Sequence, residues 1–167
     1  MKTFKNLYDS TVKFKQWRSN YPDVDGKLVD IIPNVTAKLI TFRFRVKSAS
    51  KRNEGYNVWL QFYDMKYGDR PLSSTSVKII DKETQKPLYF ERIDLFKQNC
   101  RVRCGCADFR FRFSWEDRDN GCLYGGVPKS YTPVPGSNRP PVNPQHRPGF
   151  CKHIWQCCKA IEHFFAR

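Results

Sequence analysis

Cys104-Gly-Cys106-Ala-Asp-Phe decides the fold together with a second stretch, Cys151-Lys-His153. A gap of 44 residues separates Cys106 from Cys151. Three thiolates and one imidazole form a soft ligand set that suits tetrahedral Zn²⁺. Gly105 allows a tight turn, which we expect between one strand and the next. Cys151 and His153 are expected at the start of the last helix, whose dipole favours the Cys151 thiolate. We therefore predict a Zn²⁺ site formed by Cys104, Cys106, Cys151 and His153.

The other cysteines leave alternatives to this site. All seven lie after residue 99, at positions 100, 104, 106, 122, 151, 157 and 158. An odd number without a secretory leader favours metal ligands in a reducing compartment over a disulfide framework. A disulfide set, or cysteines buried as small apolar residues, remains the alternative. Cys157 could substitute for a ligand, and Asp108 could support one from the second layer of the site.

These residues carry a resemblance to a known family. Cys104-Gly-Cys106 followed by Cys151-Lys-His153 resembles the SWIM-type zinc finger, whose pattern is CxC…CxH in a β-β-α arrangement. With the flanking Arg101-Val-Arg and Pro140-Pro-Val-Asn-Pro144, it is similar to SWIM-containing proteins of large tailed bacteriophages. The resemblance covers about residues 99–160 and implies zinc binding and contact with DNA or protein. The long gap and the extra cysteines depart from the usual pattern.

The chain before the cysteines is expected to be rich in β-strands. Apolar and basic residues alternate over 41–47, and a second alternating run covers 56–63, which predicts an antiparallel hairpin. Shorter strands are expected at 77–80 and 88–90, and a short helix within the first 25 residues. The predicted class is α+β: a small antiparallel sheet with a C-terminal β-β-α module held by zinc. Residues 1–98 and 99–167 form its two parts, or one continuous domain.

The C-terminal part divides into three segments. Phe109, Phe111, Phe113 and Trp115 alternate with polar residues, which predicts a further strand. Residues 120–149 are rich in Pro, Gly, Ser and Asn and predict a long irregular loop. We expect this loop to take an extended, non-helical course against the protein's own body or a neighbouring subunit. An amphipathic helix is predicted from 151 to 165.

The charge of the chain points to an anionic partner. There are 30 Lys and Arg residues against 16 acids, a formal net charge of +14. Arg43, Arg45 and Lys47 share one face of their strand, and Arg110 and Arg112 share the analogous face of the later one. If these strands belong to one sheet, five cations line one side and attract phosphates without reading bases. A solvated sheet face is the alternative.

The function expected from these features is not catalytic. No nucleophile elbow, phosphate loop, HExxH or kinase signature is present. No apolar run approaches 18 residues, and no secretory leader is recognisable, so neither a membrane partner nor secretion is expected. We expect a zinc-stabilised structural component of a tailed-phage virion, with other phage structural proteins as partners. The alternative is a DNA-binding accessory protein that contacts the DNA backbone in the cytoplasm of the infected bacterium.

Overall fold

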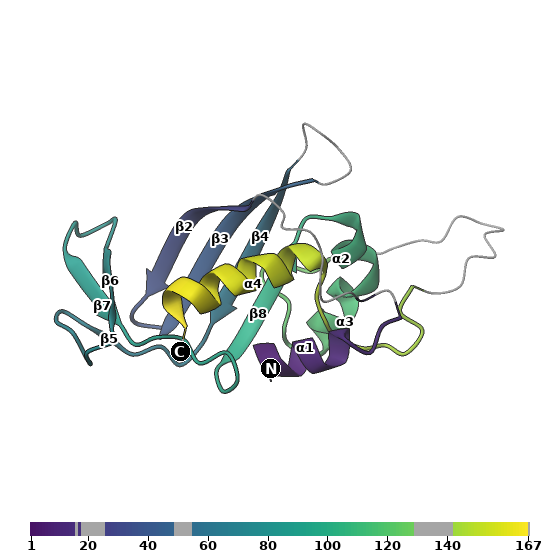
Figure 1. Cartoon of the computed structure of the whole chain (residues 1–167), viewed down its shortest axis with the longest axis horizontal. Helices are drawn as coiled ribbons and strands as arrows, with labels where there is room; N and C mark the ends of the chain where they lie inside the picture. Colours follow the sequence, from purple (N-terminus) through teal and green to yellow (C-terminus); the bar gives the residue numbers. More distant parts are fainter. Residues whose placement is uncertain (16, 18–25, 49–54, 129–141, 167) are drawn as a thin grey trace.

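The computed structural model confirms the α+β class and describes residues 1–15, 17, 26–48, 55–128 and 142–166 (Figure 1). Helix α4 lies across one face of the larger sheet, with the smaller sheet at one end and the short helices at the other. The elements are β1 (Lys2–Thr3), α1 (Phe4–Thr11), β2 (Gly26–Asn34), β3 (Leu39–Lys47), β4 (Gly55–Phe62), β5 (Tyr67–Gly68), β6 (Val77–Ile80), β7 (Pro87–Phe90), β8 (Asn99–Cys104), α2 (Ala107–Arg112), α3 (Ser114–Asp119) and α4 (Lys152–Phe165).

The main sheet has five antiparallel strands in the order β1-β8-β4-β3-β2. The predicted hairpin is confirmed, since β3 pairs with β4 and Phe42 faces Leu60. Leu60 in turn faces Val102 of β8, so one row of fully buried side chains crosses three strands. Because β8 follows residue 98, the main sheet takes its strands from both parts of the chain. Side chains alternate between the two faces of a strand, so this row defines the apolar face.

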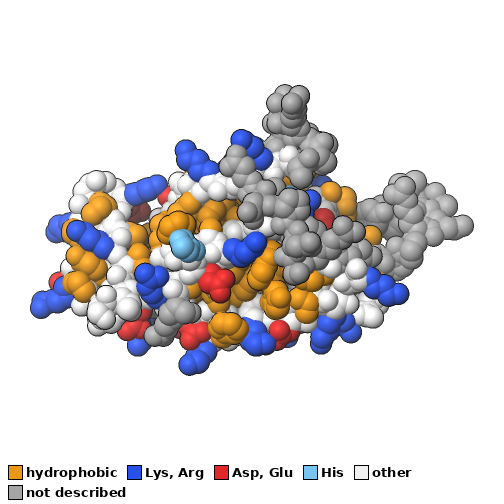
Figure 2. Space-filling view, viewed as in Figure 1, with side chains coloured by type: hydrophobic (Ala, Val, Ile, Leu, Met, Phe, Trp, Pro, Cys, Tyr) orange, Lys and Arg blue, Asp and Glu red, His pale blue; other side chains and the backbone are white. Residues whose placement is uncertain are grey.

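Helix α4 covers that apolar face. Its buried residues include Ile154 and Ile161, which pack with the sheet in the hydrophobic core. Phe165 also reaches the sheet, where its ring lies 5.2 Å from the ring of Phe42. In the space-filling view from this side, apolar side chains show between charged ones over the region of α4 (Figure 2). The predicted C-terminal helix is thus confirmed, as is the short N-terminal helix, which is α1. None of the helices in the described ranges is long and apolar enough to cross a membrane.

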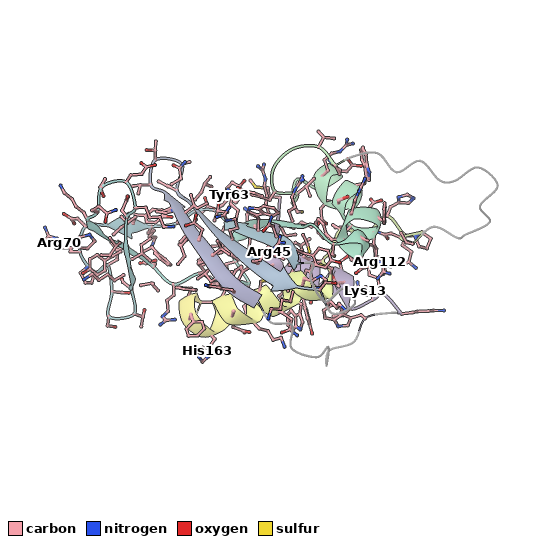
Figure 3. All side chains as sticks on the ribbon, turned by 90° about the horizontal axis from the view of Figure 1, so that it is seen from above. Lys13, Arg45, Tyr63, Arg70, Arg112 and His163 are labelled. Carbon is pink, nitrogen blue, oxygen red and sulfur yellow. The ribbon has the colours of Figure 1, made fainter. Side chains whose placement is uncertain are left out.

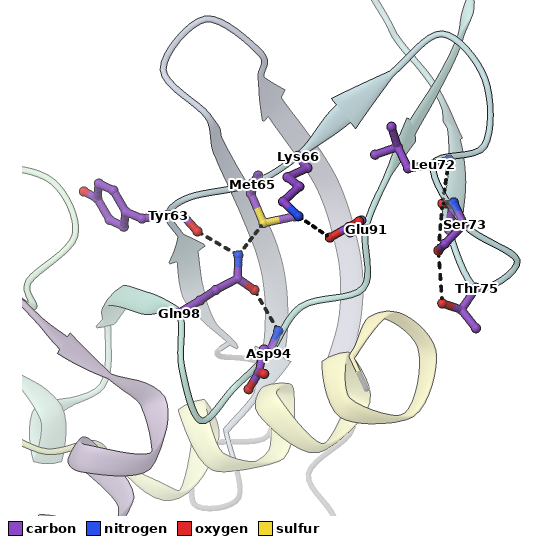
Figure 4. A network of polar contacts seen from close by, with 10 residues as sticks. Tyr63, Met65, Lys66, Leu72, Ser73, Thr75, Glu91, Asp94 and Gln98 are labelled. Carbon is purple, nitrogen blue, oxygen red and sulfur yellow. Dashed lines mark hydrogen bonds and ion pairs between the residues drawn. The ribbon is translucent and has the colours of Figure 1, made fainter.

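The two short predicted strands belong to a separate sheet with the order β5-β7-β6. A polar network connects its neighbourhood to the end of β4 (Figure 4). The Gln98 amide nitrogen donates to the carbonyl of Tyr63 at 2.8 Å, and the Asp94 backbone N–H donates to the Gln98 carbonyl oxygen at 2.7 Å. Lys66 forms an ion pair with Glu91 at 3.4 Å. This network fixes the turn that leads into β8.

The predicted strand over 109–115 is wrong: this stretch forms α2 and the start of α3. Phe109 and Phe113 are four residues apart, so both lie on one helical face and both are buried. Phe111 lies between them in sequence and is 43% exposed, which an alternating strand would not produce. The sulfur of Cys106 accepts a hydrogen bond from the Phe109 N–H at 3.3 Å and caps the helix. The CxC pair therefore connects a strand to a helix, not two strands.

Candidate metal centre

Cys104, Cys106, Cys151 and His153 come together in one buried cluster. Their ligand atoms all lie within 4.8 Å of one another. The sulfurs of Cys104 and Cys151 are each 3.8 Å from Nδ1 of His153. A tetrahedral metal with Zn–S bonds of about 2.3 Å separates its ligand atoms by about 3.8 Å. The cluster could therefore bind one metal ion, and we call these four residues the metal centre.

The first ligand pair is positioned by the end of β8. The Gly105 N–H donates to the carbonyl of Asn57 at 3.0 Å, which holds the turn against β4. The Cys106 N–H donates to the sulfur of Cys104 at 3.4 Å. A sulfur that accepts backbone N–H groups is stabilised as a thiolate. The turn thus directs both sulfurs to the same point.

The second pair lies at the start of α4. Cys151 is the N-cap residue of the helix, and His153 lies in its first turn. The aromatic ring of Tyr56 packs 5.0 Å from the imidazole ring and orients it. Because Nδ1 faces the sulfurs, Nε2 points away from them, and it has no hydrogen-bond partner among the described residues. This assigns Nδ1 as the ligand atom.

The electrostatics of the cluster favour a cation. Burial raises the pKa values of Cys104 and Cys151 well above that of a free thiol. Hydrogen bonds from these two thiols lower the pKa of Cys106. A divalent cation supplies the charge that three thiolates require in a buried site.

The remaining cysteines lie outside the metal centre. Cys100, Cys122, Cys157 and Cys158 are all buried and free of disulfides. Burial raises the pKa of Cys157 to about 12, so its thiol stays protonated. Asp108 forms an ion pair with Arg112 at 3.2 Å instead of joining the cluster.

The segment before Cys151 is held by buried polar contacts. The Gly149 N–H donates to Oδ1 of Asp117 at 2.8 Å, and the Phe150 N–H donates to Oγ1 of Thr11 at 3.0 Å. A side chain at position 149 would bring a Cβ within 2.6 Å of Thr11 Oγ1 and 2.9 Å of the Phe113 ring. Position 149 therefore requires glycine. Residues 129–141 of the predicted loop lie outside the described residues, so its predicted course stays a prediction.

Asp117 gives a pH-dependent prediction. Its carboxyl is fully buried, and burial raises its pKa well above the usual value. A raised pKa in the folded state means that the fold favours the protonated acid. The stability that this protonated acid contributes is complete below the pKa of the unfolded state and is lost as the pH rises through the pKa of the folded state. Asp117→Asn keeps an acceptor for Gly149 and cannot ionise. We expect the melting temperature of Asp117→Asn to rise relative to that of the wild type as the pH increases from about 4, the pKa of an unfolded aspartate, towards 8.5, measured by calorimetry. A constant difference across this range would contradict the prediction.

The predicted basic residues do not form one group. Arg43, Arg45 and Lys47 do share the second face of the main sheet, opposite its apolar face. Arg110 and Arg112 belong to α2, so their placement on a strand of that sheet is wrong. Arg112 pairs with Asp108 and lies over the ring of Phe113 at 5.7 Å. Figure 3 shows Arg112 with the short helices, apart from Arg45.

Three further cations on the second face of the sheet are not among the residues predicted from the sequence. Arg101 and Arg103 alternate with the buried residues of β8, and Lys27 of β2 pairs with Arg45. The strand order puts Lys27 beside Arg45 on the neighbouring strand, and it puts Arg101 and Arg103 on the same face as Arg43, one strand away across β4. The alternation in 100–104 was a usable signal, but only the pairing of β8 with β4 reveals the shared surface. We call Lys27, Arg43, Arg45, Lys47, Arg101 and Arg103 the basic face.

No family model, curated protein or solved structure is significantly similar to this chain. The resemblance to the SWIM-type zinc finger therefore stays a prediction from the two ligand pairs.

Proposed function

We propose that this chain is a non-catalytic, zinc-stabilised binding protein that holds nucleic acid on its basic face. The observation that carries the proposal is the charge of that face. Among the strand residues on it, the acid is Asp30, which already lies 3.8 Å from Arg43 and 2.5 Å from Lys82. The cations exceed this one acid and leave a positive surface that suits a polyanion.

Zinc is the proposed metal. Three cysteine sulfurs and one histidine nitrogen are a common ligand set of structural zinc sites, and four protein ligands complete a tetrahedral shell. Such a site connects strand β8 to helix α4 and contributes to stability without an open position for a substrate. Elemental analysis of the purified protein should find about one zinc per chain. A preparation without stoichiometric metal that is fully folded would overturn this part of the proposal.

Nucleic acid fits the basic face better than a protein partner does. Its cations come from β2, β3 and β8 of one sheet, whose strands are spaced by about 4.8 Å, so they form an open array on a sheet face and not a closed pocket. An array of this kind contacts successive phosphates without reading sequence. A structural role in a phage particle stays a prediction, since it rests on the predicted loop 120–149, of which residues 129–141 lie outside the described residues.

Salt-dependent binding tests this proposal. The change is Lys27→Gln, Arg45→Gln and Lys47→Gln together, and each of these side chains is exposed. If all three contact phosphates, the slope of log affinity against log salt should fall by about 2 to 3, with an affinity loss on the order of tenfold or more. Fluorescence anisotropy with a labelled oligonucleotide between 50 and 250 mM salt measures both.

The matched control is Lys66→Gln, Arg70→Gln and Lys97→Gln. These side chains are 72%, 85% and 84% exposed and lie outside the basic face. The control changes the net charge by the same amount, so a contribution from overall charge would weaken both proteins equally. Equal loss in the two triple variants, or no binding by the wild type, would refute the proposed function.

A further inference from the structure

The basic face also carries aromatic side chains, and their arrangement deepens the proposed function. Trp59 of β4 is paired with Arg43 on one side and with Arg103 on the other. Tyr124 stacks on Trp59, with ring centroids 6.1 Å apart and planes 19° apart. We infer that the Trp59–Tyr124 pair is a base-stacking platform and that the nucleic acid bound there is single-stranded. This inference rests on the proposed function.

The platform is held in place by Arg103. Its guanidinium donates hydrogen bonds to the carbonyls of Tyr124 and Gly126. The N–H of Tyr124 donates to the carbonyl of Val102 at 3.1 Å, so residue 124 lies beside β8. Trp59 is thus fixed by its strand and Tyr124 by an arginine and a backbone hydrogen bond. A rigid aromatic pair loses little conformational entropy when a base stacks on it.

A second aromatic group lies on the same face. Tyr63 donates to the side-chain carbonyl of Gln61 at 3.0 Å, and the guanidinium of Arg101 lies 5.4 Å from its ring centre. Gln61 donates to Thr41 at 3.0 Å, so a polar row crosses from β4 to β3. Figure 3 shows Tyr63 and helix α4 on opposite sides of the sheet. Trp59 and Tyr63 therefore offer two aromatic positions along one strand, each beside an arginine.

This combination favours single strands over duplexes. In a duplex the bases are stacked on each other, and their flat surfaces are closed to protein side chains. Single strands expose those surfaces, and aromatic rings bind them whatever the sequence while cations follow the backbone. A phosphate array alone would bind a duplex at least as well, because a duplex has the higher charge density. The stacked pair Trp59–Tyr124 is therefore the feature that favours single strands over duplexes.

Three probes of equal length separate these contributions on the wild-type protein. They are labelled oligothymidine of 15 nucleotides, a 15-base-pair duplex, and a 15-unit abasic strand that keeps the phosphates and lacks the bases. We expect oligothymidine to bind about 5- to 100-fold more tightly than the abasic strand, as stacking of one or two bases would produce. It should also bind more tightly than the duplex.

Trp59→Leu tests the platform itself, because leucine keeps an apolar side chain on the strand. It should reduce the affinity for oligothymidine about 5-fold or more and leave the abasic strand unchanged, while Trp59→Phe should restore most of the loss. The control is Trp115→Leu, because Trp115 lies on α3 and not on the basic face. Its ring centre is 4.3 Å from the guanidinium carbon of Arg118. If Trp59→Leu fails to fold, Tyr124→Leu and the three probes still decide the result.

Different results refute the stacking platform and the proposed nucleic-acid binding. Equal affinity of the wild type for oligothymidine and the abasic strand overturns the stacking platform but leaves the basic face intact. Tighter binding of the duplex also overturns it. Absence of binding to all three probes refutes the proposed function together with this inference.

Discussion

Chelation of the metal should unfold the protein at moderate temperature. Structural zinc contributes on the order of 10 kcal/mol in small zinc-binding domains, whereas domains of this size are stable by only about 5–15 kcal/mol. The metal centre connects β8, α2 and α4, and without the cation nothing bonds its three buried cysteine sulfurs and the imidazole to one another. We expect Cys151→Ser to reproduce the effect of chelation. Circular dichroism melts with and without a chelator, paired with elemental analysis, measure both.

Cys157→Ala is the matched control for this prediction. Cys157 is buried on the same helix but is not part of the metal centre, so its loss should cost about 1 to 2 kcal/mol and leave the zinc content unchanged. It also tests whether this cysteine can replace a ligand. Melts that coincide with and without chelator, or zinc that is lost from Cys157→Ala and retained by Cys151→Ser, would contradict the assignment of the site.

The metal centre was predictable because its signal is local. Each ligand pair is two residues apart, and spacing and residue type alone indicate a zinc site. The 44-residue gap between the pairs does not weaken this prediction, because the fold can bring Cys104 and His153 together whatever their separation in sequence. Sequence could not show that the turn at Cys106 starts a helix, because Phe109–Trp115 satisfies a period of two. The burial of Phe109 and Phe113 at a spacing of four decides for the helix.

The basic face shows the opposite case. Arg43, Arg45 and Lys47 lie on one strand, and alternation places them on one side without further information. Arg101 and Arg103 join them only through the antiparallel pairing of β4 with β8, whose register is set by long-range packing. Alternation along a strand predicts which face of the sheet a residue lies on, but not which residues of other strands lie next to it. Surfaces built across strands therefore depend on the tertiary structure.

Phe150→Ala should strongly destabilise the protein although Phe150 is not a metal ligand. Its buried ring packs against two others in a cluster of three nearly parallel rings. Its centroid lies 4.8 Å from that of Phe4 and 6.2 Å from that of Trp155, and those two rings are 6.5 Å apart. It thus joins α1 to α4 directly before the ligand Cys151. Removing a buried phenyl ring leaves a cavity and costs about 3–5 kcal/mol.

The control for Phe150→Ala is Phe164→Ala. Phe164 is 60% exposed near the end of α4, and we expect its substitution to cost about 0.5 kcal/mol or less. Urea denaturation of the zinc-loaded proteins measures both losses. The backbone contact of residue 150 with Thr11 does not depend on the ring, so Phe150→Ala should still bind one zinc per folded chain. Its lower stability would then come from the aromatic contacts and not from the metal. A loss no larger than that of Phe164→Ala would show that α1 is not held to the metal-binding segment by this ring.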